Sequence, residues 1–309
     1  MTEALYTPRE YLSITTLLSF VRCPRLYFYR KSGLVPKIRG NALLYGTAMH
    51  KAIAPTLTNG LEAGMEAFTS VWDDSLADDK RSTARARAQL THFAHVHSAN
   101  RSLYTFEKPP PLPEGFQVTD DRSPYEIPAV IDVGLPVPIV VFIDGWVRHR
   151  DTGELWGYEF KTTSRLDSKL FEALEFHPQV LFYTLALKTV SGAKVRGMMA
   201  EAMLIDKTKV DSITQPVLVQ DHQLESILRW VQYYGALLLE CEERYKLTGN
   251  VEHAFPKNFS GCSAYPHYYI PSFSCDYMNL CRAPGWEMLK DLYDVVPDHK
   301  YVTLTTGGK

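Results

Sequence analysis

The sequence predicts an α/β protein with a mixed central sheet flanked by helices. Helical periodicity and strand-like alternation occupy separate stretches, with helices at about 13–31, 45–57, 60–103, 166–190 and 221–247 and strands at 115–161, 195–205 and 214–220. The order helix, strands, helix, strand, helix assembles the sheet from the middle of the chain. With 309 residues, 45% of them hydrophobic, the chain can bury a substantial core, and we expect one domain over 1–309.

The N-terminal third is predicted to be helical. Leu17, Leu18 and Val21 share one face of the first helix, and Cys23-Pro24 interrupts the pattern before a second short helix. We expect a helical insertion at about 55–105, whose basic and histidine-rich end indicates a solvated face or a surface that faces DNA. A proline-rich connector at 109–113 then separates the helices from the strands.

Residues 140–163 organise the predicted sheet. Two apolar runs, VVFIDGWV and ELWGYEFK, are joined by a turn at 148–153 that ends in Asp-Thr-Gly. Turn residues between two strand-like runs predict an antiparallel hairpin. Because side chains alternate along a strand, Glu159 and Lys161 face the same way, and antiparallel pairing can bring Asp144 beside them.

The charged side chains of this hairpin have two interpretations. One is a salt bridge at an edge strand. The other is a divalent cation such as Mg²⁺, which prefers oxygen ligands and would be held by Asp144, Glu159 and the backbone carbonyl of Phe160. An amine beside that cation, here Lys161, can orient the attacking water or accept its proton, so the group has the parts to cleave a phosphate ester. We favour the metal site.

Composition excludes several classes of function. The formal net charge is −2, so the chain has no global basic field of the kind that marks many nucleic-acid-binding proteins. A polyanion would have to be held by a local patch. We expect neither a membrane span nor a secretory signal, because no apolar run approaches about 18 residues and the N-terminus lacks a basic start before an apolar core. The expected location is the cytoplasm, or the host cytoplasm if the chain is viral.

Five short motifs follow one another along the chain: SFVRCPRLYFY at 19–29, GTAMH at 46–50, IDG at 143–145, EFKTT at 159–163 and QVLFY at 179–183. With these motifs in this order, the chain resembles the RecB-like branch of the PD-(D/E)XK nuclease superfamily. That branch also contains the CRISPR-associated iron–sulfur exonucleases and many phage nucleases. The resemblance spans most of the chain, and five ordered motifs are more selective than any one of them. It implies a restriction-endonuclease-like core.

The resemblance also assigns roles to residues of the hairpin and of the first motifs. It implies that Asp144, Glu159 and Lys161 are catalytic, and that His50 of the GTxxH-like motif is a metal ligand together with the two acids and the Phe160 carbonyl. Without the resemblance, His50 would be read as an ordinary helix histidine.

The QxxxY motif maps to Gln179 and Tyr183, which the resemblance places beside the active site as support for it and for the DNA. Their spacing of four puts them on one helix face, where a polar rim on an apolar helix is the alternative. Glu126, on a preceding strand, is a candidate for a second metal.

The cysteines suggest a second metal centre. Cys262, Cys275 and Cys281 have C-x12-C-x5-C spacing, and Cys23 lies near the N-terminus. Four thiolates can hold a [4Fe–4S] cluster or a tetrahedral Zn²⁺, and spacing alone does not separate these from plain burial. The resemblance implies a [4Fe–4S] cluster, with structural Zn²⁺ as the alternative. It would staple the N-terminal region to a cysteine-bearing segment at about 252–290.

A bound nucleic-acid strand needs cations for its phosphates and surfaces for its bases. Basic and aromatic residues interleave near the N-terminus and around the hairpin, which suits a channel for single-stranded DNA. The candidates are Arg22, Arg25, Lys31, Lys37, Arg39, Arg148, Arg150 and Arg165 for phosphates, and Tyr27, Phe28, Tyr29, Tyr45 and Trp146 for bases. Arg25 and Tyr27 belong to the family-like CPRxY string.

We therefore expect a metal-dependent deoxyribonuclease that uses Mg²⁺ or Mn²⁺, acting as an exonuclease on single-stranded DNA or duplex ends in DNA repair, recombination or processing. A helicase or recombination protein is the expected protein partner. The alternatives are a non-catalytic DNA-end-binding or assembly subunit that retains the nuclease fold, and a zinc-stabilised interaction protein. The complete set of Asp144, Glu159 and Lys161 favours the enzyme, because a binding module has no need of all three.

Overall fold

A computed structural model describes residues 10–37, 40–107, 114, 116–118, 127–262, 275–282, 292–296 and 302–304. The predicted connector at 109–113 lies outside these residues. Contacts group the chain into two compact units, where the sequence predicted one domain. Unit 1 consists of Met1–Ile38, Asp132–Val140 and Arg229–Leu304, and unit 2 of Arg39–Ile131, Val141–Leu228 and Thr305–Lys309. Hydrophobic periodicity does not reveal this division, because unit 1 combines segments from distant parts of the chain.

Unit 2 holds the central sheet and the helices that cover it. Its helices are α3 (Asn41–Asn59), α4 (Leu61–Thr69), η2 (Asp74–Leu76), α5 (Thr83–Asn100), α6 (Ser168–Glu175) and α7 (Pro178–Ser191). Its strands are β2 (Tyr104–Phe106), β3 (Phe116–Val118), β4 (Ile127–Ile131), β6 (Gly145–His149), β7 (Leu155–Thr163), β8 (Val195–Leu204) and β9 (Ser212–Leu218), and β5 (Ile139–Ile143) spans the boundary between the units. The predicted insertion at 55–105 is helical over most of its length.

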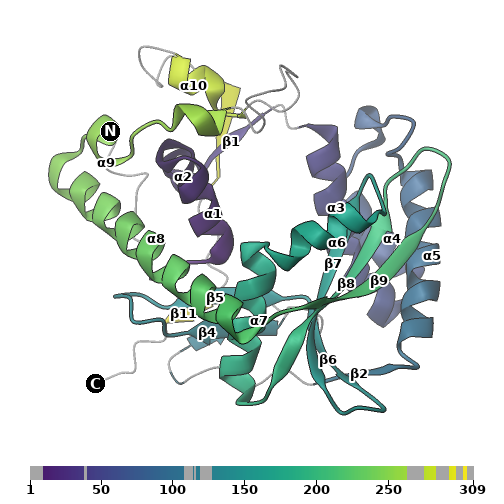
Figure 1. Cartoon of the computed structure of the whole chain (residues 1–309). Helices are drawn as coiled ribbons and strands as arrows, with labels where there is room; N and C mark the ends of the chain where they lie inside the picture. Colours follow the sequence, from purple (N-terminus) through teal and green to yellow (C-terminus); the bar gives the residue numbers. More distant parts are fainter. Residues whose placement is uncertain are drawn as a thin grey trace. The chain divides into compact units, whose positions relative to one another are not determined.

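The five-stranded sheet has the order β2-β6-β7-β8-β9 (Figure 1). Strands β7 and β8 are parallel, and the other neighbours in this sheet are antiparallel. The parallel pair requires a crossover, which α6 and α7 provide. The predicted α/β class with a mixed sheet flanked by helices is confirmed.

The predicted hairpin is the β6–β7 pair, in which Gly145 faces Tyr158 and Arg148 faces Leu155. Gly153 adopts a φ of 69° in the connecting turn, a conformation that favours glycine. One detail differs from the prediction: the first apolar run is two strands rather than one. It bends at Asp144, after which β6 joins the five-stranded sheet while β5 pairs with β4 in a separate two-stranded sheet.

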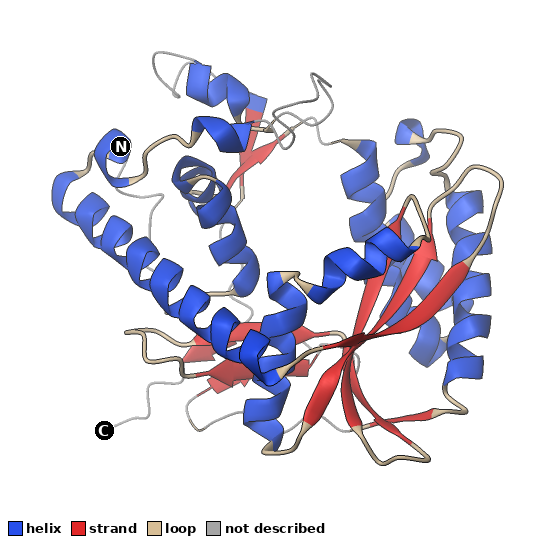
Figure 2. Ribbon diagram, viewed as in Figure 1, coloured by secondary structure: helices blue, strands red, loops and turns tan. Residues whose placement is uncertain are grey.

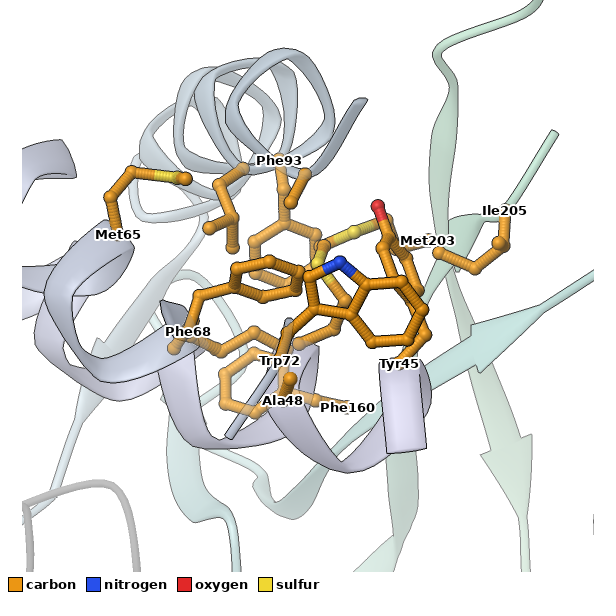
Figure 3. Packing of buried hydrophobic residues seen from close by; sticks show 14 of the residues in the cluster. Tyr45, Ala48, Met65, Phe68, Trp72, Phe93, Phe160, Met203 and Ile205 are labelled. Atoms are coloured by element: carbon orange, nitrogen blue, oxygen red, sulfur yellow. The ribbon is translucent and has the colours of Figure 1, made fainter. Parts of the chain in front are cut away.

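The core of unit 2 lies between one face of the sheet and helices α3, α4 and α5 (Figure 3). Alternation along β7 points Tyr158 and Phe160 into this core, where Phe160 packs against Phe93 with ring centroids 5.5 Å apart. Tyr45 and Phe68 are fully buried in the same cluster. Each large side chain buried in this way contributes roughly 1.5–3 kcal/mol, so α3 is held firmly on the sheet.

Unit 1 contains α1 (Ile14–Arg22), α2 (Pro24–Lys31), β1 (Leu34–Pro36), α9 (Val251–Ala254), η3 (Phe259–Cys262), α10 (Met278–Arg282), β10 (Tyr293–Val295), β11 (Val302–Leu304) and the Arg229–Thr248 part of helix α8 (Asp221–Thr248), as Figure 2 shows by element type. The predicted interruption at Cys23 is the junction of α1 and α2, where Pro24 takes the first helical position. Strands β1 and β10 pair antiparallel. None of the helices that the structure describes is both long and apolar enough to span a bilayer.

Candidate active site

Strand β7 places Glu159 and Lys161 on the face of the sheet opposite the core cluster. Gly157, on the same face, is packed so closely that a Cβ would come within 2.8 Å of Leu187 Cδ1 on α7. Two residues further along, the Glu159 side chain is only 3% exposed and accepts a hydrogen bond from Lys161 Nζ, whereas the Lys161 side chain is 25% exposed. The pair therefore extends from the protein interior toward solvent.

Asp144 lies at the bend between β5 and β6 and reaches the same region. Its Oδ2 accepts a hydrogen bond of 2.7 Å from the Phe160 amide, and His50 Nε2 lies 3.4 Å from the same oxygen. The Phe160 amide of β7 thus donates to the Asp144 side chain. Beyond the Gly145–Tyr158 pair, this carboxylate takes the place of a backbone acceptor on β6. The bend that the sequence did not predict is thus the feature that aims Asp144 at the site.

His50 approaches from helix α3, whose Met49 and Ile53 anchor it in the core. Burial lowers the pKa of His50. The hydrogen bond and negative charge of Asp144, with a contribution from Glu159, raise it by more than burial lowers it, and the resulting pKa is about 9. In the metal-free chain His50 therefore carries a proton at pH 7. Ligation of a metal through this ring requires release of that proton.

Glu159 also has a perturbed pKa. Burial and the charge of Asp144 raise it, the charge and hydrogen bond of Lys161 lower it, and the result is a pKa of about 7. Two buried carboxylates that share one region disfavour each other's ionised form. A cation between them would remove this conflict.

Helix α7 carries the QxxxY pair toward Lys161. Gln179 Oε1 accepts a hydrogen bond of 3.0 Å from Lys161 Nζ, and Gln179 Nε2 donates one of 3.0 Å to the Tyr183 hydroxyl. The helix begins at Pro178, and the His177 side chain caps it by accepting a hydrogen bond from the Gln179 amide. The side-chain amide of Gln179 is thereby fixed by Lys161 and Tyr183. The Lys161 ammonium is held between Glu159 and Gln179.

The donor set suits a hard divalent cation. Glu159 Oε2 is buried and has no hydrogen-bond partner in the described part of the chain. An unpaired carboxylate oxygen next to the Asp144 carboxylate fits Mg²⁺ or Mn²⁺, which prefer oxygen ligands. Across the described residues, no group of three or more His, Cys, Asp or Glu side chains has a metal-binding arrangement. Ligation by the Phe160 carbonyl stays a prediction, and Glu126 lies outside the described residues.

A second buried polar group lies on the opposite face of the sheet, among the aromatic core residues. Glu201 of β8 is fully buried, its Oε2 lies 2.8 Å from His97 Nδ1, and the same oxygen accepts a hydrogen bond from the Tyr158 hydroxyl. This corrects the interpretation of the histidine-rich stretch at 85–101 for His97, which is 2% exposed. Other members of the stretch are exposed, as predicted for a solvated face, namely Arg87, His95 and Arg101. The sequence did signal Glu201, as the one acid inside the apolar run VRGMMAEAML.

The structure also corrects the predicted DNA contacts of Arg25 and Tyr27. Arg25 is 3% exposed; its guanidinium donates to the Phe255 carbonyl at 2.9 Å and to Glu252 at 2.7 Å. Tyr27 is 1% exposed and donates a hydrogen bond to Glu242. Both side chains hold α2 inside unit 1 and cannot contact DNA directly in this arrangement.

The other aromatic candidates for base stacking are buried as well. They are Phe28, Tyr29, Tyr45 and Trp146, and Lys31 among the cationic candidates is buried too. Arg148 donates hydrogen bonds to Glu107 and to the Gly153 carbonyl, and Arg39 lies outside the described residues. Local sequence could not separate exposed from buried aromatic residues here, because the groups that cover them come from distant segments.

The four predicted cysteine ligands gather in unit 1. Cys23 Sγ accepts a hydrogen bond of 3.4 Å from the Asn258 amide, and the Cys275 amide donates one of 3.0 Å to the Cys262 carbonyl. Burial raises the pKa of the Cys275 and Cys281 thiols, and the charges of the other cysteines add to the rise. All four are free thiols. The four cysteines thus lie in the same unit, and among the described residues they do not form a metal-binding arrangement.

Comparison with known proteins identifies a nuclease family and solved structures that are similar to this chain. The model of the PD-(D/E)XK nuclease superfamily matches residues 11–282. A crystal structure of a protein from Eubacterium rectale, described as a "Putative exonuclease", is similar over 76% of this chain and 82% of its own, with 12% sequence identity and a TM-score of 0.48. No curated protein matches the sequence significantly. The mixed sheet with flanking helices fits the restriction-endonuclease-like fold.

Proposed function

This chain belongs to the PD-(D/E)XK nuclease superfamily, and on that premise we propose that it hydrolyses DNA phosphodiester bonds with Mg²⁺ or Mn²⁺ at the site around Asp144, Glu159 and Lys161. The observation that carries the proposal is the convergence of these three side chains with His50 on one face of the sheet. A surface salt bridge at an edge strand does not explain it, because β7 is central and Glu159 is buried beside a second acid.

Each residue has a distinct task in this proposal. Asp144 and Glu159 would hold the cation, with His50 and the Phe160 carbonyl as further ligands. When bound, the cation supplies positive charge for the phosphate in the transition state and a water of lowered pKa. The hydrogen bond from the Phe160 amide holds the Asp144 carboxylate in position for the cation.

The Lys161 side chain is partly exposed, and its ammonium can face the phosphate or orient the attacking water. Its two acceptors, Glu159 and Gln179, fix the ammonium in position. Tyr183 acts one step further away, since it accepts from the Gln179 amide group and thereby orients the Gln179 oxygen toward the lysine. Gln179 and Tyr183 are therefore positioning residues.

We propose cleavage from the ends of single-stranded or duplex DNA, supported by the order of the five motifs along the chain. A helicase or recombination protein is the proposed partner. The alternative, a non-catalytic subunit that binds DNA ends, has no use for a buried carboxylate pair, and no observation in the described residues favours it.

For the cysteines we propose a [4Fe–4S] cluster, with Zn²⁺ as the alternative. The support is that all four cysteines lie in unit 1, where the Cys23 thiol accepts a hydrogen bond from the Asn258 amide and the Cys275 amide donates one to the Cys262 carbonyl. Bound metal would tie α1 and α2 to the C-terminal segment and lower the thiol pKa values that burial raises. Anaerobically purified protein should be brown and absorb near roughly 400 nm if the cluster is present. Colourless protein with stoichiometric zinc would decide for the alternative.

The nuclease proposal is tested by digestion of oligonucleotides labelled at the 5′ or 3′ end, single- and double-stranded, with Mg²⁺ or Mn²⁺ and with EDTA. Wild type should cut only with metal, and Lys161→Ala and Asp144→Ala should not cut. Lys188→Ala is the matched control, because Lys188 lies on α7 in an exposed ion pair with Asp221. Cleavage by Lys161→Ala at the wild-type rate would refute the assignment.

A further inference from the structure

An exposed aromatic side chain lies at the corner between α6 and α7. Phe176 ends α6 and is 73% exposed, although a phenyl ring loses favourable burial energy in such a position. It differs in this from Tyr27, Tyr45 and Trp146, which the sequence suggested for base stacking and which are all buried. Isolated exposed apolar residues are common, so the position of this one decides whether it has a role.

Phe176 borders the candidate active site through its neighbours in sequence. Gln179, three residues later, accepts a hydrogen bond of 3.0 Å from Lys161 Nζ. Three residues span at most about 10 Å, so the Phe176 backbone lies close to the residue that contacts the lysine. The intervening His177 caps the helix that carries Gln179, and burial together with the positive charge of Lys161 lowers the pKa of His177.

The hydrogen bonds of His177 fix which ring nitrogen carries the proton. Its Nδ1 accepts from the Gln179 amide at 3.3 Å, so the neutral ring has its proton on Nε2. This side chain is half-buried, and its Nε2–H is a donor two residues before Gln179, whose side chain accepts from the lysine that the proposed mechanism places at the phosphate. The corner between α6 and α7 thus carries an exposed apolar ring and a neutral hydrogen-bond donor within three residues of Gln179, whose side chain contacts Lys161.

We propose that Phe176 and His177 form a subsite for one unpaired nucleotide of single-stranded DNA next to the scissile phosphate, where Phe176 stacks on the base and His177 Nε2–H donates to a phosphate oxygen. This rests on the proposed function, because it takes Lys161 as the group that faces the phosphate. A base within a duplex is already stacked on both faces, so the subsite selects unpaired ends.

The stacking contact is tested by a cycle that removes the ring and the base separately. An abasic residue is placed in turn at each of the two nucleotides on either side of the cleaved bond of a single-stranded oligonucleotide. At one position it should lower kcat/KM of wild type by roughly 5- to 150-fold, the range for stacking on one base. Phe176→Ala should show the same loss with intact DNA and little further loss at that abasic position. Equal abasic penalties in wild type and Phe176→Ala at all four positions would overturn the proposal.

Three variants control for other effects. Phe176→Leu keeps apolar surface without an aromatic face and should behave like Phe176→Ala. Leu218→Ala removes another exposed apolar side chain. Leu218 pairs with Gly197 in the sheet, whereas Lys161 pairs with Ala202 near the other end of the same strand, so this variant should cleave intact and abasic DNA as wild type does. His177→Ser keeps a helix-capping oxygen but removes the Nε2–H donor, and should raise KM with little change in thermal stability.

A binding experiment separates this inference from the proposed function. Lys161→Ala, which should not cut, is titrated with fluorescent intact and abasic single strands, with and without the Phe176→Ala change. A loss of affinity on base removal that depends on Phe176 supports the subsite even if wild type proves to have no nuclease activity. An abasic effect independent of Phe176 overturns the subsite even if wild type cuts DNA.

Discussion

Unit 2 buries two glutamates on adjacent strands of one sheet, and they are in opposite situations. Glu201 of β8 faces the aromatic core with 0% exposure, where His97 and Tyr158 both contact one of its oxygens. Glu159 of β7 faces the other side with 2% exposure, and its nearest charged groups include a second acid, Asp144. Each glutamate has one oxygen without a hydrogen-bond partner in the described residues.

Burial of an acid therefore does not by itself identify a functional site. What distinguishes Glu159 is its like-charged neighbour and its connection to solvent through Lys161. Two adjacent carboxylates are unfavourable in the protein alone and become favourable with a cation. One oxygen of Glu201 is held by His97 and Tyr158 and no second acid lies against it among the described residues of the core cluster, so we assign Glu201 to stability, and we assign Glu159 to binding and catalysis. This division predicts which variants lose activity and which lose stability.

The largest expected effect is on cleavage. Glu159→Gln keeps the shape of the side chain but removes the charge that would hold the cation, and the cleavage rate should fall by on the order of 10³-fold. The protein should remain folded, as circular dichroism can check. Full activity in this variant would show that Glu159 does not differ from Glu201 in function.

Substitution of the core glutamate, Glu201, should lower stability rather than activity. Glu201→Ala leaves His97 and Tyr158 without their shared acceptor and opens a cavity, so the free energy of unfolding should fall by about 3–5 kcal/mol. Urea denaturation measures this loss. Activity per folded molecule should change far less than in Glu159→Gln. A stable Glu201→Ala protein without activity would reverse the assignment of the two residues.

Metal binding gives the next effect. Mg²⁺ at 100 times its dissociation constant should stabilise wild type by about 2.7 kcal/mol, because it binds the folded chain. The stabilisation should be lost in Asp144→Ala and kept in Glu201→Gln, which preserves the core side chain's shape. Thermal melts with Mg²⁺ and with EDTA, on protein whose cysteine-bound metal content has been measured, provide the comparison.

The raised pKa of Glu159 gives a smaller effect of known sign. In the metal-free folded chain its pKa is about 7, above the usual value near 4.5, so the folded state holds a proton that the unfolded state releases. Stability from this group is full below about pH 4.5 and is lost as the pH rises through 7. Wild type minus Glu159→Gln in EDTA, measured between pH 5 and 8, should show this decline. With saturating Mg²⁺ the decline should disappear, because the cation favours the ionised carboxylate.

The smallest expected effect concerns the support of Lys161. Gln179→Ala removes one of its two acceptors, and the rate should fall about tenfold, equivalent to one hydrogen bond. Tyr183→Phe acts only through Gln179 and should have less effect. If Tyr183→Phe were the more damaging change, the chain of contacts from Tyr183 to Lys161 would not be the way in which this helix supports the site.

The sequence predicted those features that depend on local periodicity. Alternation in ELWGYEFK was enough to put Glu159 and Lys161 on one face, and the Asp-Thr-Gly turn predicted the pairing of β6 with β7. The bend at Asp144 escaped prediction, because it depends on a hydrogen bond to an amide 16 residues away.

Burial was the less predictable property. Arg25 and Tyr27 are covered by groups more than 200 residues later in the chain, and no local pattern separates them from exposed residues such as Phe176. The sequence assigned DNA contacts to the former and none to the latter. His177 had a signal, a histidine directly before a proline at the start of a helix, which is a capping pattern rather than a catalytic motif.

We propose that the carboxylate of Glu159, and not that of Glu201 in the core, acts in phosphodiester cleavage. The most direct test compares wild type, Glu159→Gln and Glu201→Gln on one 5′-labelled single-stranded DNA with Mn²⁺. We predict that wild type and Glu201→Gln degrade the strand and that folded Glu159→Gln leaves it intact. Degradation by Glu159→Gln at the wild-type rate would contradict the account.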